Sequence, residues 1–268
     1  MKYFVFSDVH GYYSILKKSL KKAGFDEKNE NHMLISIGDN FDRGPENYKM
    51  FLFLKRMKKK NKIILIRGNH EDLFIDMMLR NQVIDIDIHN GTYDTLNEFY
   101  KLLFKESEIN APKYGFHEIY QKLKSKEFFK LIFEMEDYYE TENYIFTHGF
   151  IPVNMDGPKW YYRSNFEYNP NWRDLTRYDF KDSRWLNGIM MSMKFNISEP
   201  NKKIVVGHYH SSYGNVRKDM GPGFTEKEYR YNEFSKKEYF KPYEDENIIA
   251  IDACTHYSKT INVVVIED

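Results

Sequence analysis

The sequence contains little cysteine, no excess of charge of either sign and no long apolar run. Cys254 is the single cysteine among 268 residues, which excludes an intramolecular disulfide and a metal cluster held by thiolates. Forty basic residues balance forty acidic ones, so the overall charge does not favour nucleic acid as a partner. No segment approaches the roughly 18 apolar residues of a membrane span, and the N-terminal apolar run is too short for a signal peptide. We therefore expect a soluble, cytoplasmic monomer without a membrane or nucleic-acid partner.

The first third of the chain alternates short β-type runs with amphipathic segments. The predicted strands cover residues 3–7, 33–37 and 62–66, and the predicted helices cover 13–23, 46–59 and 71–81. This β-α-β-α-β-α order is typical of a mostly parallel sheet with helices on its faces. Ligands bind such sheets at the carboxyl ends of the strands.

The middle of the chain has a different pattern from the two ends. Residues 83–142 are mainly helical in pattern and rich in aromatic side chains, which predicts an insertion packed beside the sheet. Further strands are predicted at 138–147, 203–206, 248–253 and 260–267, with a short helix at 186–194. We expect the last two strands to form a closing hairpin. Because no low-complexity linker interrupts the chain, we expect one domain over residues 1–268, with the insertion at about 83–142.

Five short motifs lie along the chain in a fixed order, and four of them directly follow a β-type run. They are Asp8-Val9-His10, Gly38-Asp39-Asn40-Phe41-Asp42-Arg43-Gly44, Arg67-Gly68-Asn69-His70-Glu71, His148-Gly149 and Gly207-His208-Tyr209-His210. Their carboxylates, carboxamide and imidazoles suit two divalent cations held side by side, and such two-metal sites displace groups at phosphorus. Mixed oxygen and nitrogen ligands without thiolates suit manganese, iron or zinc better than calcium or magnesium.

The spacing inside the motifs supports this interpretation. Asp8 and His10 are two residues apart at a strand exit, so in an extended backbone both side chains face the same side. Asp39 has two carboxylate oxygens with which it could bridge two ions. His210 follows His208 by two residues, so its side chain can turn back toward the first ion.

At these residues the sequence resembles the calcineurin-like metallophosphoesterases. The second and third motifs are similar to the phosphoprotein phosphatase branch, and within it to compact bacterial and phage enzymes: serine/threonine phosphatases and symmetrical diadenosine tetraphosphate hydrolases. The resemblance covers roughly residues 1–80 and 144–268. It implies an α/β fold of four layers, α/β/β/α, in which two mixed sheets lie face to face with helices outside.

The resemblance also implies a set of metal ligands. The first metal would take Asp8, His10 and Asp39, and Asp39 would bridge to the second. The other ligands of the second metal would be Asn69, His148 and His208. His210 departs from the phosphoprotein phosphatase pattern, which has a single histidine in this motif. In the wider family the second histidine binds the first metal, so His210 is a candidate ligand that could also lie idle.

The catalytic roles implied by the resemblance fall on the second and third motifs. His70 would be the general acid for the leaving oxygen, with Asp42 hydrogen-bonded to it. Arg43 would grip phosphate oxygens through a forked, charge-assisted contact, and Asn69 would also lie at the substrate. The nucleophile would be a hydroxide that bridges both metals. A second phosphate-binding arginine is expected among Arg163, Arg173, Arg177 and Arg184, and Arg184 is the favoured candidate.

The implied activity is hydrolysis of a phosphomonoester by two divalent metal ions, with manganese expected and iron or zinc as alternatives. The substrate would be phosphoserine or phosphothreonine in a protein, or a small phosphorylated metabolite. A dinucleoside polyphosphate or nucleotide hydrolase would use the same catalytic residues, so the motifs leave that alternative open. An inactive binding module on the same fold is a remote alternative. Such a protein is expected to lose metal ligands or the acid, whereas this sequence contains all of them.

Overall fold

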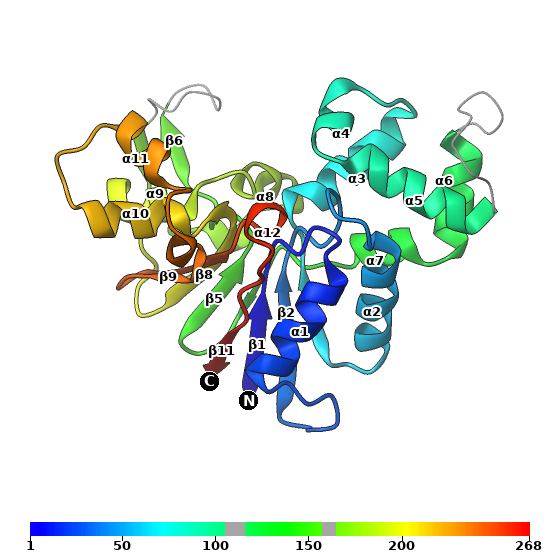
Figure 1. The fold of residues 1–268 in the computed structure, drawn as a ribbon, viewed down its shortest axis with the longest axis horizontal. Coiled ribbons are helices and arrows are strands. Elements are labelled where there is room, and N and C mark those ends of the chain that lie inside the picture. The colour runs from blue at the N-terminus through cyan, green and yellow to red at the C-terminus, as the bar shows by residue number, and fades with distance from the viewer. Residues whose placement is uncertain (105–115, 157–164) are drawn as a thin grey trace.

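Two mixed β-sheets pack face to face in the computed structural model, which describes residues 1–104, 116–156 and 165–268 (Figure 1). The first sheet has the strand order β11-β1-β2-β3. Its strands are β1 (Lys2–Phe6), β2 (His32–Ile37), β3 (Ile63–Ile66) and β11 (Val264–Glu267). The first three run parallel to one another, and β11 is antiparallel to β1.

The second sheet has the order β4-β5-β8-β10-β9. Its strands are β4 (Tyr138–Glu140), β5 (Tyr144–Thr147), β8 (Lys203–His210), β9 (Tyr243–Glu244) and β10 (Ile248–Asp252). The three central strands are parallel, and the strand at each edge is antiparallel to its neighbour. A separate pair of short strands, β6 (Asn154–Asp156) and β7 (Asn165–Glu167), follows β5 in the chain. Two mixed sheets were predicted, and this prediction is confirmed.

Side chains alternate along the strands between two apolar layers. In β1, Tyr3 and Val5 belong to the core between the sheets, whereas Phe4 and Phe6 pack under the helices of the first sheet. In β8, Val205 faces the first sheet, and its neighbours Ile204 and Val206 face the helices of the second sheet. A strand buried on both faces is apolar at consecutive positions, which explains why the predicted strands read as continuous apolar runs.

Helices cover the outer face of each sheet (Figure 1). On the side of the first sheet the helices are α1 (Tyr13–Ala23), α2 (Asn47–Lys59), α3 (Asn69–Arg80), α4 (Asp85–His89), α5 (Thr92–Phe104), α6 (Phe116–Ser125) and α7 (Phe128–Phe133). Of these, α4 and α5 pack on other helices, and α6 packs on α7. After β7 the chain forms α8 (Arg177–Ser183), α9 (Gly188–Phe195), α10 (Ser212–Met220), α11 (Glu226–Asn232) and α12 (Thr255–Ser258), with 3₁₀ turns at Trp172–Asp174 and Lys237–Phe240. Among the described residues no helix combines the length and apolar character needed to cross a bilayer.

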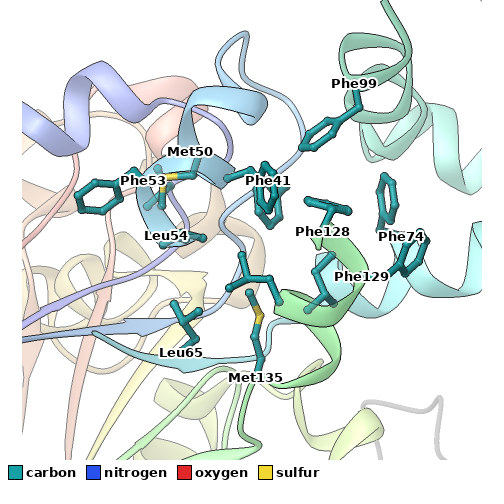
Figure 2. Packing of buried hydrophobic residues seen from close by; sticks show 14 of the residues in the cluster. Phe41, Met50, Phe53, Leu54, Leu65, Phe74, Phe99, Phe128, Phe129 and Met135 are labelled. Atoms are coloured by element: carbon teal, nitrogen blue, oxygen red, sulfur yellow. The ribbon is translucent and has the colours of Figure 1, made fainter. Parts of the chain in front are cut away.

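The predicted insertion is helical and shares the core of the first sheet. The ring centroid of Phe128 in α7 lies 4.5 Å from that of Phe99 in α5 and 5.1 Å from that of Phe74 in α3. Figure 2 shows these rings beside Phe41 and Leu65 in one continuous apolar layer. The insertion therefore packs directly on the elements that carry the motifs.

Two predictions about strands were wrong in detail. Residues 138–147 form two antiparallel strands, β4 and β5, rather than one. The last two strands do not form a hairpin: β10 lies in the second sheet beside β8, and β11 lies in the first sheet beside β1. Residues 253–263, which include α12, carry the chain from one sheet to the other. Alternation of apolar residues identifies a strand and its faces, but it does not identify the neighbouring strand.

Candidate metal centre

The five motifs meet at the carboxyl ends of the parallel strands of both sheets. Asp8 and His10 follow β1, Asp39 follows β2, and Asn69 begins α3 directly after β3. From the second sheet, His148 follows β5, and His208 and His210 lie at the end of β8. The sandwich thus brings together side chains as distant in the chain as Asp8 and His208, which are 200 residues apart.

The backbone at the ends of these strands adopts an uncommon conformation. Asp8, His10, Asp39 and His208 have φ angles of 50°, 46°, 54° and 65°. A left-handed backbone at a residue other than glycine costs of order 1–3 kcal/mol and is maintained only where surrounding contacts fix it. Asp42 and Arg43 of the second motif share this conformation, with φ angles of 73° and 65°, so the motifs contain several such residues close together in space.

Asp8, His10 and Asp39 form a first group of candidate ligands. The Nε2 atom of His10 lies 4.0 Å from Oδ1 of Asp8 and 3.8 Å from Oδ2 of Asp39. The Nδ1 atom of His10 is 3.0 Å from the carbonyl oxygen of Phe41, to which it donates a hydrogen bond. This bond leaves the Nε2 lone pair directed toward the two carboxylates, as a metal ligand requires.

Asp39, Asn69, His148 and His208 form the second group. His148 donates its Nδ1–H to the carbonyl oxygen of Ile37 at 2.7 Å, and its Nε2 lies 2.8 Å from Oδ1 of Asn69 and 3.3 Å from Oδ1 of Asp39. Ligand atoms of Asp39, His148 and His208 lie within 4.8 Å of one another. With Nδ1–H already donated, His148 Nε2 can face two oxygen acceptors only when a proton or a cation lies between them.

The electrostatics of the second group fit a bound cation. Burial would lower the pKa of His148, but Asp39 reverses this effect and the pKa rises to about 9. Burial would likewise raise the pKa of Asp39, but the imidazoles of His148 and His70 hold it well below its usual range. The buried carboxylate of Asp39 thus favours positive charge on the groups around it. Divalent ions supply that charge at such sites, so these residues fit a metal.

His70 lies beside the first group and is held by Asp42. The Nδ1–H of His70 donates to Oδ2 of Asp42 at 2.7 Å, which turns Nε2 toward Asp39, 3.9 Å away. Asp42 also accepts hydrogen bonds from the hydroxyls of Thr92 at 2.9 Å and Thr95 at 2.6 Å. Burial lowers the pKa of His70, but Asp39 and Asp42 outweigh it and raise the pKa above its usual value.

Thr92 and Thr95 were not identified by the sequence analysis. Both are fully buried in α5, inside the segment predicted as an insertion. A threonine in a helical pattern carries no positional signal of this role, because its contact with Asp42 spans 50 residues or more. The insertion therefore contributes directly to the orientation of His70.

The carboxylate of Glu71 accepts hydrogen bonds from backbone amides of the second and third motifs. Its Oε2 accepts hydrogen bonds from the backbone amides of Asp39 at 3.0 Å and Gly68 at 2.8 Å, and its Oε1 accepts one from the amide of Asn40 at 2.9 Å. The side chain is fully buried. Glu71 thus joins the second motif to the third and satisfies amides that no strand or helix pairs.

Arg43 and His210 lie at the entrance of the site. Nη1 of Arg43 is 3.1 Å from Nε2 of His10. His210 is partly exposed, with Nε2 4.0 Å from Oδ2 of Asp252. Two groups of side chains have ligand atoms that all lie within 4.8 Å of one another, His10 with Asp39 and His70, and Asp39 with His148 and His208. The side chain of His210 lines the cavity outside both groups, as does that of Asp8.

Asp252 is a buried carboxylate that the sequence analysis missed. It ends β10, and its Oδ1 accepts a hydrogen bond from the amide of Cys254 at 2.7 Å. Burial, together with the charge of Asp39, raises its pKa to about 7. Asp252 in turn contributes to the raised pKa of Asp8, after burial. Asp252 could have been identified by the rule that identified Asp8, since both are acidic residues at the carboxyl end of a parallel strand.

Arg184 does not line the cavity, contrary to the sequence-based expectation of a phosphate contact. It is 1% exposed and its guanidinium is held by Asp72, at 2.7 Å, and by Asp137. Arg173 pairs with Glu140, and Arg177 pairs with Asp137. Arg163 lies outside the described residues. None of the three described candidates therefore presents a free guanidinium to the cavity.

The metal centre opens into a cavity of about 940 Å³. One side is polar and carries Asp8, His10, Asp39 and His70. The connections of the second sheet contribute most of the remaining lining, which includes many apolar side chains. The apolar lining consists of Pro152, Val153, Met155, Phe166, Leu175, Trp185, Leu186, Met190, Tyr209, Tyr213 and Phe234. The site thus has room for a substrate much larger than phosphate.

Comparison with proteins of known sequence supports the geometry. The chain is 29% identical over 165 residues to an asymmetrical bis(5′-nucleosyl)-tetraphosphatase PrpE of Oceanobacillus iheyensis, which covers 59% of this chain and 60% of that protein. It is 33% identical over 78 residues to serine/threonine-protein phosphatase 1 of Salmonella typhimurium, which covers 29% of this chain and 33% of that protein. The chain thus matches less than two thirds of the length of either relative.

Among solved structures, a cold-active protein-tyrosine phosphatase of a psychrophilic Shewanella aligns with 100% of this chain and 75% of its own, with a TM-score of 0.51 and 19% identity. At that identity the likeness concerns the fold alone. The sequence profile of the calcineurin-like phosphoesterases matches residues 1–249, which include all five motifs. The chain therefore belongs to the calcineurin-like phosphoesterase family.

Proposed function

We propose that the protein is a phosphoesterase that uses two divalent metal ions to hydrolyse phosphomonoesters. The observation that carries this proposal is that two groups of ligand atoms share Asp39, and that His70 stands directly beside them. Two-metal hydrolysis of phosphate esters requires such a bridging carboxylate and an adjacent proton donor.

Seven residues would hold the metals. Asp8, His10 and Asp39 would bind the first ion, Asp39, Asn69, His148 and His208 would bind the second, and His210 would be an additional ligand of the first. When bound, the ions supply a water acidified at neutral pH and polarise the phosphate oxygens. We expect manganese, with iron or zinc as alternatives, because the donors are oxygen and imidazole nitrogen.

The remaining side chains have distinct proposed roles. Asp42 holds Nδ1 of His70, so Nε2 of His70 is the atom that gives its proton to the leaving oxygen. Arg43 lies over His10 at the entrance and would bind phosphate oxygens through two parallel hydrogen bonds. Asn69 also lines the cavity and would contact the phosphate. The apolar lining of the cavity would receive the organic part of the substrate.

The favoured substrate class is a phosphomonoester, either on a protein serine or threonine or on a small metabolite. The alternative is a dinucleoside polyphosphate or nucleotide, which is supported by the similarity to the Oceanobacillus bis(5′-nucleosyl)-tetraphosphatase. Against a polyphosphate, Arg43 is the one lysine or arginine among the described cavity residues, whereas Asp179, Asp182 and Glu233 also line the cavity. An inactive binding module is disfavoured because every ligand and the acid are present. A cytoplasmic monomer and a single domain over residues 1–268 stay predictions.

A substrate panel with manganese tests the proposal. It compares a phosphoserine peptide, an aryl phosphate, an aryl phosphate diester, a cyclic nucleotide and a dinucleoside tetraphosphate. We expect turnover of the two monoesters, its loss after chelation and its recovery with manganese. Preferred turnover of the tetraphosphate would move the assignment to the alternative. Absence of metal-dependent turnover, with less than one equivalent of bound metal after manganese loading, would contradict the proposal that the protein is a metal-dependent enzyme.

A further inference from the structure

Residues 183–185, at the end of α8 and the start of the connection to α9, lie beside the elements that carry the second group of ligands. This 183–185 segment comprises Ser183, Arg184 and Trp185, and none of them is among the proposed ligands. Each of the three reaches a different ligand-bearing element. These contacts assign the segment a role that the five motifs do not show.

The first contact is with the turn that carries His148. The backbone amide of Phe150 donates to the carbonyl oxygen of Ser183 at 3.1 Å. Gly149 lies so close that a Cβ atom there would be 2.6 Å from the carbonyl oxygen of Arg184. Real Cβ atoms do not approach other atoms so closely, so the turn after His148 rests on the segment with no space between them.

The second contact is with His208. The indole of Trp185 meets the imidazole of His208 edge-to-face, with ring centroids 5.7 Å apart and an interplanar angle of 84°. This ring contact limits rotation of the imidazole and so helps to orient its nitrogen atoms toward a metal.

The third contact is with α3, which carries Asn69 in its first turn. Nη1 of Arg184 lies 2.7 Å from Oδ2 of Asp72, three residues after Asn69. Arg67, just before α3, approaches the other oxygen of Asp72 at 3.4 Å. Nη2 of Arg184 binds Asp137, which anchors the guanidinium to the start of the second sheet. The guanidinium is buried, so its position is fixed by these carboxylates.

We propose that the 183–185 segment positions three of the four ligands of the second metal, and that Arg184 is the positioning residue that joins Asn69 to the other two. The proposal rests on the two-metal function proposed above. It predicts that the affinity of the second metal site depends on Arg184, although Arg184 touches neither metal nor substrate. Loss of residues that orient metal ligands typically weakens metal binding by roughly 10–100-fold.

The first metal site has separate supports, so the effect should be asymmetric. Asp8 is held by Ser7, and its carbonyl oxygen accepts a hydrogen bond from Thr255 at 2.8 Å. The amide of His208 also donates to Asp8, at 3.0 Å, but this contact comes from the backbone of β8 and not from the imidazole that Trp185 contacts. His10 is held by the carbonyl oxygen of Phe41. None of these contacts involves the 183–185 segment. A general loss of structure would weaken both sites together, whereas a positioning role predicts loss at the second site alone.

The test is calorimetric titration of metal-free protein with Mn²⁺ for wild type, Arg184→Lys and Arg184→Met. Electron paramagnetic resonance at increasing Mn²⁺ separates isolated ions from spin-coupled pairs. Asp137→Asn is a milder variant that weakens one anchor of Arg184 and leaves Asp72 in place. Arg173→Met is the matched control, because Arg173 also pairs with two carboxylates, Glu140 and Glu199, but contacts no ligand-bearing turn.

For Arg184→Met we expect the dissociation constant of the second ion to rise by roughly 10–100-fold, with the first unchanged and the coupled signal appearing only at higher Mn²⁺. Arg184→Lys and Asp137→Asn should change it in the same direction but less, and Arg173→Met should behave as wild type. Equal weakening of both ions, or two unchanged ions in the Arg184 variants, would overturn the positioning role. A wild-type protein that binds fewer than two ions would instead overturn the proposed function and this inference with it.

Discussion

His70 and Asp42 form a buried pair in which Nδ1–H of the imidazole donates to Oδ2 of the carboxylate at 2.7 Å. The carboxylate is in turn held by two threonines of α5. Because a histidine can donate a proton only while it is protonated, the pair determines the pH range in which His70 acts as an acid. The group is functional below its pKa and is lost as the pH rises through that value.

The first prediction concerns Asp42→Asn. Burial lowers the pKa of His70, and Asp39 and then Asp42 raise it above its usual value. Removal of the charge of Asp42 should therefore lower that pKa. The alkaline limb of kcat against pH should then move to lower pH. At neutral pH kcat should fall, but by less than the ~10²–10⁴-fold that general acid catalysis contributes. The dependence of kcat on pH, measured for wild type and Asp42→Asn with an alkyl phosphate, checks this prediction. An unchanged alkaline limb would show that Asp42 does not influence the pKa of the acid.

The second prediction concerns Thr95→Val in the insertion. The Thr95 hydroxyl donates to Oδ1 of Asp42 at 2.6 Å and accepts from the amide of Asp42 at 3.0 Å. Valine leaves both buried groups with fewer partners, which costs about 1–3 kcal/mol of unfolding free energy. We expect this loss in urea unfolding together with a lower kcat and unchanged metal content. Thr95→Ser keeps the hydroxyl and is the control, and equal behaviour of the two variants would exclude the hydroxyl as the cause.

The third prediction concerns Arg43→Ala. The guanidinium lies at the entrance of the site and does not belong to the ligand groups. Its loss should raise KM with a smaller effect on kcat, since a contact made equally in the ground state and the transition state changes only binding. Steady-state kinetics with manganese measure both constants, and Arg43→Lys tests whether the forked geometry matters beyond charge. An unchanged KM in Arg43→Ala would remove Arg43 from the phosphate site.

The fourth prediction concerns Phe128 of α7, which joins the insertion to the core (Figure 2). Phe128 is fully buried, with its ring 4.5 Å from Phe99 and 5.2 Å from Phe41. Phe128→Ala should cost about 3–5 kcal/mol, the usual loss for a buried phenylalanine. Leu102→Ala is the control, because Leu102 is 52% exposed on α5 and should cost far less. Denaturant unfolding of both variants measures the difference. Similar values would show that the insertion is not part of the cooperative core.

The sequence was sufficient to predict that the motif residues lie together at one edge of the sheets, because its signals are local. A carboxylate or imidazole directly after a strand marks a position at the sheet edge, as Asp8, Asp39 and His148 do. The same rule could have found Asp252 after β10. The first helices and strands were predictable for a similar reason, since periodicity depends on neighbours in the chain.

The remaining features depend on contacts between distant residues. Nothing near Arg184 in the sequence indicates that Asp72 and Asp137 hold it, because those partners lie 112 and 47 residues away. The pairing of β11 with β1 is equally non-local, since the sequence of each strand shows only that it is apolar and not which strand it pairs with. Sequence patterns therefore predicted the candidate metal ligands and the candidate acid, but not the residues that hold these side chains in place.

The last prediction concerns Gly207→Ala, which should damage the first metal site as the Arg184 variants should damage the second. A Cβ atom at Gly207 would collide with Oγ of Ser7 and Oδ2 of Asp8, and would be 2.9 Å from Cβ of Ser7. Asp8 must move, and since its carboxylate is a proposed ligand, Gly207→Ala should lose the first Mn²⁺ in calorimetric titration. Adding Ser7→Gly removes the clash with the serine but not the clash with Asp8. The double variant should therefore regain unfolding free energy without regaining the metal. Normal affinity for two ions in Gly207→Ala would show that Asp8 is not a ligand.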